Sequence, residues 1–290
     1  MKSDTVAVYE HELGERHLAG AMALSHVANW NQNEADWRMM LRLGTGFGLS
    51  AVDGGLLASI VVLPYAAKFA WMSMVLVSPE HRRLGYASRM LRRALAYLQS
   101  RGLTAVLDAT PAGHEVYAQE GLRDTWGFQR YGMSAAQPVA ASQDVPGLAL
   151  RCLVDGDWPQ ILALDLPAFG ANREALLRAL AARLPEAALV AKRGDKICGF
   201  LLGRDGREAR QLGPLVAADL PAAQALLAHA LQRVPAPIYI DIVDRHASLS
   251  SWALMHGFAR QRPFTRMVHG AERAPGDNET VILVAGPELG

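Results

Sequence analysis

The sequence predicts a mixed α/β protein built from two copies of one fold. Three observations support this prediction: the chain is 290 residues long, five segments recur in the same order in its two halves, and β-rich stretches alternate with amphipathic helical stretches. At roughly 150 residues per domain, the length alone suggests two domains. Alternating strands and helices are typical of a sheet covered by helices, so we expect a mixed sheet in each half.

The recurrence indicates a tandem duplication. The five segments of the first half begin at Trp30, Leu49, Met74, Val106 and Glu120. Their partners lie 139, 140, 139, 133 and 136 positions later, and nearly equal offsets in one order are unlikely to arise by chance. The break falls in AAQPVAASQDVP, which has two prolines and no periodicity. We expect an N-terminal domain over residues 1–137, a linker over 138–147 and a C-terminal domain over 148–290.

Within each half the expected order is two helices, a hairpin, a strand, a long helix, a strand, a short helix and a strand. In the first half, an amphipathic helix follows the polar turn after Trp30, and the glycine-containing segment 49–55 predicts a hairpin turn. The clearest helix covers residues 87–98, where apolar residues recur at i, i+3, i+4, i+7, i+8 and i+11. Gly102 is its expected stop.

Composition limits the classes of function. The chain has 29 basic and 28 acidic side chains, so its net charge of +1 argues against a nucleic-acid partner. The longest apolar run, residues 55–67, is shorter than the ~20 residues that a membrane span needs, so we expect no membrane anchor. The N-terminus lacks the apolar core of a signal peptide. Cys152 and Cys198 are too few for a disulfide framework, so we expect a cytoplasmic protein.

No metal site is expected. His11 and His17 flank a glutamate in HELGERH, but they are six residues apart. The zinc-binding H-E-x-x-H pattern needs a spacing of four, which places both rings on one helix face.

The segment from Met74 to Ser88 carries the strongest chemical signal. A β-rich run stops at Pro79, and a basic loop containing Gly85 opens directly into the long helix. The free N–H groups and positive dipole end of a helix N-terminus bind anions such as a diphosphate. The loop is neither a Walker A motif nor a dinucleotide fingerprint. On these residues alone, an ordinary strand–loop–helix with a basic turn is an equal alternative.

The stretch from Val6 to Met133 resembles the GCN5-related N-acetyltransferases, the GNAT family. The family signature is V-x-P-x-x-[RQ]-[RQ]-x-x-G-x-[GA], and VSPEHRRLGYA at residues 77–87 fits its core, with Arg82 starting R-x-x-G-x-A. A second family block, Y-x-x-x-G-[FL], matches residues 117–122, in the family's order. The resemblance implies acetyl-CoA as the donor substrate.

The same resemblance implies how acetyl-CoA is held. The backbone of residues 75–77 would pair with the pantetheine arm and point an N–H at the thioester oxygen, and residues 83–88 would wrap the pyrophosphate. Thr110 stands where the family often has an asparagine that contacts the pantetheine. The implied donor-binding residues are Val75, Leu76, Val77, Arg82, Arg83, Leu84, Gly85, Tyr86, Ala87, Ser88 and Thr110.

Tyr117 is the implied catalytic residue, because it stands where the family places a tyrosine beside the sulfur. When an amine attacks the thioester, an N–H aimed at the carbonyl oxygen stabilises the developing charge by ~3–4 kcal/mol. The departing thiolate then needs a proton, which a phenol supplies. The alternative for Tyr117 is a half-buried aromatic residue that packs on the sheet.

The acceptor site and the general base are less defined by the sequence. The candidate substrate residues are Trp30, Asp36, Asp108 and Asp241. Trp30 and Asp36 lie between the first two helices, where the family forms its acceptor pocket. Asp108 is a candidate general base, as are His114 and Glu115 after it, and Asp241 or Asp165 could meet an ammonium group. Structural roles are equal or better alternatives: a core position for the tryptophan and a buried structural role for the acids. A water chain is also an alternative to a side-chain base.

The second half has the repeat but not the loop. Residues 218–221 (ADLP) replace the RRLG of the first half, and Ala253 stands in place of Tyr117. The F-G-x-N-R at 169–173 and G-P-L-V-A at 213–217 resemble certain bacterial tandem-GNAT proteins, whose second half is degenerate. We expect this half to complete the acceptor pocket or to hold the architecture.

These expectations combine into one functional hypothesis. The chain is expected to transfer an acetyl group from acetyl-CoA to a primary amine of a small molecule by direct attack. The alternative is a non-catalytic acyl-CoA-binding sensor or scaffold on the same fold. The sequence leaves the oligomeric state open between monomer and homodimer.

Overall fold

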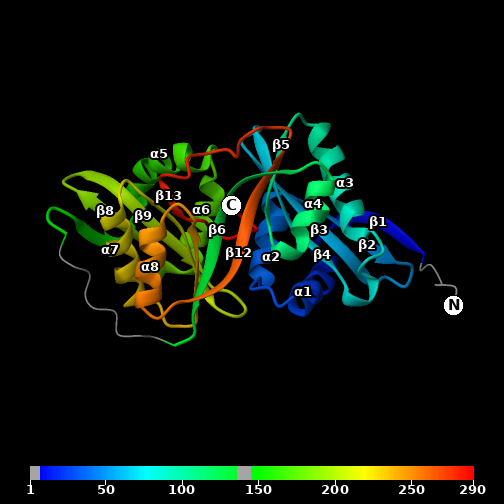
Figure 1. The fold of residues 1–290 in the computed structure, drawn as a ribbon, viewed down its shortest axis with the longest axis horizontal. Helices are drawn as coiled ribbons and strands as arrows, with labels where there is room; N and C mark the ends of the chain where they lie inside the picture. The colour runs from blue at the N-terminus through cyan, green and yellow to red at the C-terminus, as the bar shows by residue number, and fades with distance from the viewer. Residues whose placement is uncertain (1–6, 136–144) are drawn as a thin grey trace.

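The computed structural model describes residues 7–135 and 145–290, so most of the expected linker, residues 138–144, lies outside the described part. Within these residues one mixed sheet runs through the whole protein, with the strand order β1-β2-β3-β4-β5-β12-β6-β11-β13-β10-β9-β8-β7. Figure 1 shows two halves side by side, with the last residues of the chain between them.

The two halves have the same element order, which confirms the predicted tandem repeat. The first half contains β1 (Val8–Leu13), α1 (Leu18–Val27), α2 (Glu34–Leu43), β2 (Thr45–Ala51), β3 (Leu56–Tyr65), β4 (Phe69–Val77), α3 (Tyr86–Gln99), β5 (Thr104–Ala109), α4 (Pro111–Gln119) and β6 (Arg123–Met133). The second contains β7 (Ala149–Cys152), α5 (Trp158–Phe169), α6 (Glu174–Arg183), β8 (Leu189–Arg193), β9 (Lys196–Arg204), β10 (Arg210–Ala217), α7 (Leu220–Leu231), β11 (Ile238–Val243), α8 (Ala247–Met255) and β12 (Ala259–His269). A further short strand, β13 (Val281–Leu283), follows.

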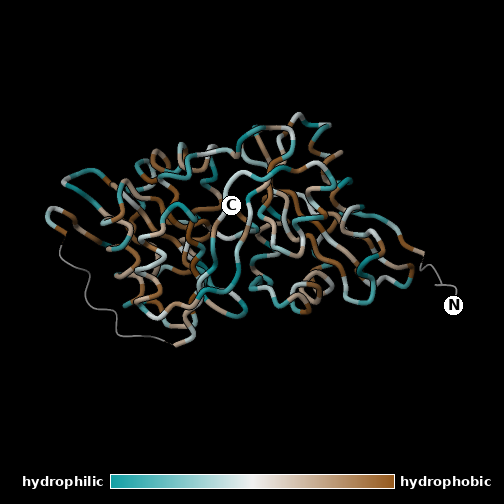
Figure 2. The backbone as a smooth tube through the Cα atoms, in the orientation of Figure 1, coloured by the Kyte–Doolittle hydropathy of each residue, from teal (hydrophilic) through white to brown (hydrophobic). Residues whose placement is uncertain are grey.

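The final long strands of the two halves are exchanged. β12 from the second half lies between β5 and β6 of the first half, and β6 pairs on its other side with β11 of the second. The sequence boundary between the halves is therefore not a boundary in the sheet. Figure 2 shows hydrophobic segments gathered inside both halves and paler or hydrophilic colouring along these central strands.

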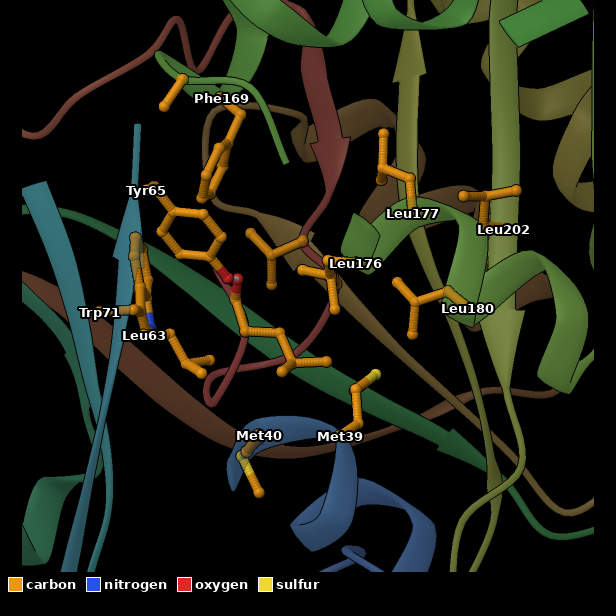
Figure 3. Close-up of a cluster of buried hydrophobic side chains, with 14 of the residues drawn as sticks. Met39, Met40, Leu63, Tyr65, Trp71, Phe169, Leu176, Leu177, Leu180 and Leu202 are labelled. Atoms are coloured by element: carbon orange, nitrogen blue, oxygen red, sulfur yellow. Dashed lines mark hydrogen bonds between the residues drawn. The ribbon is translucent and has the colours of Figure 1, made fainter. Parts of the chain in front are cut away.

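Helices cover both faces of the sheet, and one core joins the halves. The apolar side chains of α1, α2, α5 and α6 belong to a single buried cluster. Figure 3 shows its centre, where Tyr65 and Phe169 face each other and Met39 of α2 lies toward Leu176 and Leu180 of α6. On the opposite face, α3 and α4 cover the first half, and α7 and α8 cover the second.

In the first half, β4 and β5 separate after a short parallel ladder. They pair from Phe69–Thr104 to Trp71–Val106 and no further. Beyond this point Met74 and Val75 together lie opposite one residue of β3, a β-bulge, and Met74 has a positive φ of 53°. A bulge bends its strand and increases the local twist. We call the space between residues 72–77 of β4 and 107–109 of β5 the first wedge.

The second half has the same bulge in β10, where Gly213 and Pro214 lie opposite one residue of β9. β10 and β11 likewise pair in parallel at three positions only. The resulting second wedge, between residues 213–217 and 241–243, is filled by β13. Leu283 of β13 pairs with Leu215 of β10 on one side and with Ile242 of β11 on the other. The second wedge is thus closed by the chain itself.

Candidate active site

A cavity lies at the inner end of the first wedge. β4 contributes Met72 to Val75, and the second half contributes residues from β12 and from the segment after β13. The full lining is Trp30, Gln32, Met72, Ser73, Met74, Val75, Leu107, Asp108, Thr110, Tyr117, Arg130, Arg262, Phe264, Pro287 and Glu288. Five residues singled out from the sequence therefore meet here: Trp30, Val75, Asp108, Thr110 and Tyr117.

The outer end of the first wedge leads to the loop before α3. Arg82 to Gly85 are exposed, and Arg83 and Gly85 have positive φ values of 63° and 78°. A left-handed residue curls the backbone so that successive N–H groups converge, which makes an anion-binding concavity. A Cβ at Gly85 would meet no atom within 4 Å, so crowding does not explain the glycine. The positive φ explains it, because residues with a side chain rarely adopt this conformation. No side chain of the described residues caps this helix start, so the N–H groups of residues 86–88 remain available.

Tyr117 projects from α4 toward the cavity and is almost fully buried. Burial alone raises the pKa of its phenol well above the usual value. The phenol is therefore protonated throughout the physiological range and is available as a proton donor. Thr110 is the N-cap of the same helix, and its hydroxyl accepts a hydrogen bond from the Gly113 N–H at 3.3 Å. Sequence reasoning did not assign this capping role.

Asp108 lines the cavity but already has a partner. Both of its carboxylate oxygens accept hydrogen bonds from Arg266 of β12, at 2.9 and 3.0 Å. The Arg266 guanidinium lies between the rings of Trp71 and Trp126, at 4.3 and 4.0 Å from their centroids. Burial raises the pKa of Asp108 to about 6, and the nearby Arg266 opposes this increase.

The other two acidic candidates hold the halves together and do not line the cavity. Asp241 receives two hydrogen bonds from Arg130, at 2.8 and 2.7 Å, in a fully buried pair. Asp36 receives hydrogen bonds from Arg183 and Arg204, and it closes the capping box of α2. Because their oxygens are taken by arginines, the geometry does not support the substrate role expected for Asp36 and Asp241.

The cavity concentrates buried polar atoms that lack partners. Five such side-chain atoms occur among the described residues, and three line this cavity: Gln32 Oε1, Ser73 Oγ and Glu288 Oε2. A buried acceptor without a hydrogen bond costs ~1–3 kcal/mol, and more when charged. Such atoms in one cavity indicate a ligand that donates hydrogen bonds. Sequence reasoning missed Glu288, although it is the only acid after Glu279 in an otherwise apolar stretch.

The comparisons with known proteins agree with this geometry. Residues 11–121 match the model of the acetyltransferase (GNAT) family, and residues 161–283 match a second acetyltransferase (GNAT) domain model. The chain is a tandem GNAT protein. The first GNAT match ends at the second sequence block, and the second covers the half whose wedge is filled by β13.

Relatives and solved structures extend over most of the chain. An uncharacterised N-acetyltransferase of Bacillus subtilis is 25% identical over 85% of this chain and 86% of its own length. The holothin acyltransferase of a Pseudoalteromonas strain is 26% identical over 84% of this chain and 81% of its own. Together they connect this GNAT protein with acyl transfer.

Among structures, a putative acetyltransferase from Pyrococcus horikoshii covers 98% of this chain and 96% of its own, with a TM-score of 0.79 and 18% identity. A tandem GNAT protein from the clavulanic acid biosynthesis pathway covers 93% of this chain and 100% of its own, with a TM-score of 0.65 and 14% identity. At these identities the similarity establishes the tandem GNAT fold alone.

The described residues contain neither a membrane-spanning helix nor a cluster of metal ligands. No helix in residues 7–135 or 145–290 is both long and apolar enough to cross a membrane. In the same ranges, no three His, Cys, Asp or Glu residues are grouped closely enough to hold a metal ion.

Proposed function

We propose that this protein transfers an acetyl group from acetyl-CoA to a primary amine of a small molecule by direct attack. The observation that carries the proposal is the cavity in the first wedge. It brings a bulged strand edge, a buried phenol and unpaired hydrogen-bond acceptors into one space. Each of these elements suits one part of an aminolysis reaction: the thioester, the leaving thiolate and the amine.

The first wedge and the loop before α3 suit acetyl-CoA. Beyond Trp71 the edge of β4 has no ladder with β5, so the backbone of residues 75–77 is free to pair with the amide groups of the pantetheine arm. At the outer end, Arg82, Arg83 and the N–H groups of α3 offer positive charge to the diphosphate. The acetyl group would then lie in the cavity beside Tyr117.

The reaction proceeds through attack of a neutral amine on the thioester carbonyl. The nitrogen lone pair forms the C–N bond, and the negative charge on the carbonyl oxygen is stabilised by a backbone N–H of β4. The C–S bond then breaks, and the Tyr117 phenol donates its proton to the sulfur. The phenolate recovers a proton from the former amine nitrogen, so the products are the amide and free coenzyme A.

The cavity favours a small acceptor. Trp30 and Phe264 provide apolar walls, and a few polar groups lie among them, as is typical of small-molecule sites. One of the relatives is named a holothin acyltransferase, which supports acyl transfer to a small molecule over transfer to a protein. The wall residues come from both halves, which gives the second half a part in acceptor binding.

The test is release of free thiol from acetyl-CoA across a panel of small amines. Turnover with at least one amine, together with the acetylated product, is the expected result. The competing function is a non-catalytic acyl-CoA-binding sensor or scaffold. The second half, whose wedge is filled by β13, shows that one copy of this fold in the chain is kept without an open wedge. Tight acetyl-CoA binding without turnover of any amine between pH 6 and 10 would favour the sensor over the enzyme.

A further inference from the structure

The segment after β13 brings a carboxylate into the cavity, and its role goes beyond donor binding. Resting on the proposed function, we propose that Glu288 is the general base of the first half. It binds the ammonium group of the acceptor through Oε2 and removes one proton before attack. The base is thus supplied by residues 284–290, which belong to the half that lacks the donor-binding loop.

The first support is the state of the Glu288 side chain. It is 2% exposed, lines the cavity, and leaves Oε2 without a hydrogen-bond partner among the described residues. Its other oxygen accepts a hydrogen bond from Arg204. The hydrogen bond from Arg204 to Oε1 holds the carboxylate in place, and Oε2 can still accept a hydrogen bond from a bound ligand. An ammonium group donates hydrogen bonds and carries the opposite charge.

The second support is how the backbone around Glu288 is fixed. The indole N–H of Trp71 donates to the Pro287 carbonyl at 3.0 Å, and the Tyr65 hydroxyl donates to the Leu289 carbonyl at 2.9 Å. Arg173 donates to an oxygen of Gly290 at 2.7 Å. The first two come from the first half and the third from the second. Both halves therefore position this segment at the cavity.

Gly286 shows that the segment leaves room for the carboxylate. A Cβ at this position would lie 3.0 Å from Oε2 and 3.1 Å from Oε1 of Glu288, and φ is 134°. Any larger residue would force the carboxylate to move or the backbone to change. The glycine therefore permits the Glu288 carboxylate to lie where it does.

The other buried acids near the cavity are already committed. Asp108, Asp241 and Asp36 each have both oxygens engaged by arginine or backbone donors. Glu288 differs because Oε2 is unpaired. A base must reach the proton that it removes, so an unpaired oxygen on a residue that lines the cavity outweighs the mere presence of a carboxylate.

The proton balance is simple. The Glu288 carboxylate takes one proton from the ammonium ion, and the neutral amine attacks as described above. Glu288 then returns its proton to solvent once the product leaves. The charged groups around it that set the pH dependence are Arg204 at Oε1 and the cavity residues Arg130, Arg262 and Asp108. Burial, with Arg130 nearby, lowers the pKa of Arg262.

The experiment compares Glu288→Gln with the wild-type chain on two acceptors. The glutamine keeps an oxygen for Arg204 but removes the base. With an ordinary alkyl amine, protonated at neutral pH, we expect kcat/KM to fall about 100-fold or more, the usual range for a lost general base. With an analogue fluorinated beside the amine, which is already unprotonated, we expect most of this loss to disappear. The wild-type acid limb of the kcat/KM–pH profile should also vanish.

Asp157→Asn is the matched control, because it makes the same chemical change at a buried acid that pairs with Arg151 far from the cavity. It should leave both acceptors unaffected. Acetyl-CoA titration and thermal melting of each variant check the fold. If Glu288→Gln does not fold, Glu288→Asp is used instead; it shortens the side chain by one methylene and should give a smaller loss that again largely disappears with the fluorinated amine. Equal losses with both amines, or no loss, would overturn the proposal.

The design separates the two proposals. If the wild-type chain transfers no acetyl group, the proposed function fails first, and Glu288 is then judged by titration with the same amines. Binding that Glu288→Gln retains at wild-type strength would overturn the assignment of Oε2 to the ammonium group.

Discussion

The two wedges of this protein are built alike but are used differently. In both, a parallel ladder of three residue pairs gives way to a bulge, at Met74 and Val75 in the first half and at Gly213 and Pro214 in the second. The first wedge ends in a cavity, whereas the second holds β13. The bulge alone therefore does not define a binding site. A wedge remains open to a ligand only where no strand of the chain itself occupies the space between the two separated strands.

The contents of the second wedge also suggest what the first can hold. β13 is an extended peptide whose backbone pairs with the strands on both sides. The pantetheine arm of acetyl-CoA is likewise extended and carries amide groups. The same strand geometry accepts a backbone in one half, which supports our proposal that its edge pairs with an amide-bearing ligand in the other.

The largest effect that tests this contrast is expected from Gly85→Glu. The new carboxylate would stand at the loop before α3 and repel the diphosphate, and the left-handed backbone disfavours any side chain. We expect acetyl-CoA binding to fall below detection in calorimetric titration. Melting of the variant should remain cooperative, because Gly85 is exposed.

Pro221→Glu is its counterpart, because it adds the same charge to the exposed start of α7 in the second half. It should leave acetyl-CoA affinity unchanged, and the wild-type chain should bind one acetyl-CoA. A second equivalent site, or loss of binding on Pro221→Glu, would break the asymmetry.

The next effect concerns the strand that fills the second wedge. Leu283 is fully buried between β10 and β11. Leu283→Ala removes this packing and is expected to lower the free energy of unfolding by about 2–5 kcal/mol. Urea denaturation measures the change, and Val52→Ala at an exposed turn provides the control with little effect. Unchanged stability would mean that β13 does not support the second half.

Tyr117→Phe tests the catalytic side of the comparison. It removes the hydroxyl that we propose protonates the thiolate but keeps the ring in its buried place. We expect kcat to fall about 100-fold with little change in acetyl-CoA affinity. Trp252→Phe in α8 alters an aromatic residue beside the equivalent position of the second half, and steady-state rates should not respond to it. If the Tyr117→Phe variant keeps the full kcat, Tyr117 is not the proton donor and its role is packing on the sheet.

The smallest effect is a pH dependence of stability at two acids. Burial raises the pKa of Asp108 to about 6 from 3.8, so its contribution to stability is present at low pH and is lost as the pH rises through 6. Relative to Asp108→Asn, the wild-type chain should lose at most about 3 kcal/mol between pH 4 and 7. Arg151 holds the pKa of Asp157 below its usual value, so the contribution of Asp157 is lost on acidification instead. Chemical denaturation should show the Asp108 slope between about pH 4 and 6, and a slope of opposite sign from Asp157 only below its usual pKa of 3.8.

The sequence predicted the repeat, the long helix and the loop because these depend on local spacing. The apolar stripe at residues 87–98 lies in α3, Tyr86–Gln99, and Gly102 follows it with a positive φ. Likewise, the replacement of RRLG by residues 218–221 predicted a second half without a donor loop. Periodicity and turn residues are local signals, so they can be interpreted without knowing which distant segments pack against them in the fold.

The strand exchange and Glu288 depend on contacts that spacing does not encode. Consecutive strands are usually neighbours, so β6 would be expected beside β5, yet β12 lies between them. Tyr65 and Leu289, which help to place Glu288, are 224 positions apart. The acids at 36, 108 and 241 looked available in the sequence because their arginine partners are at least 111 residues away.

The exchanged strands have an evolutionary consequence. Two copies of one fold that trade their final strands have the arrangement of a strand-swapped homodimer whose protomers are joined end to end. In a symmetric homodimer every substitution appears twice, so neither copy can lose its ligand site alone. Once the copies share a chain, each varies independently, and one can give up its own site to supply a carboxylate to its neighbour.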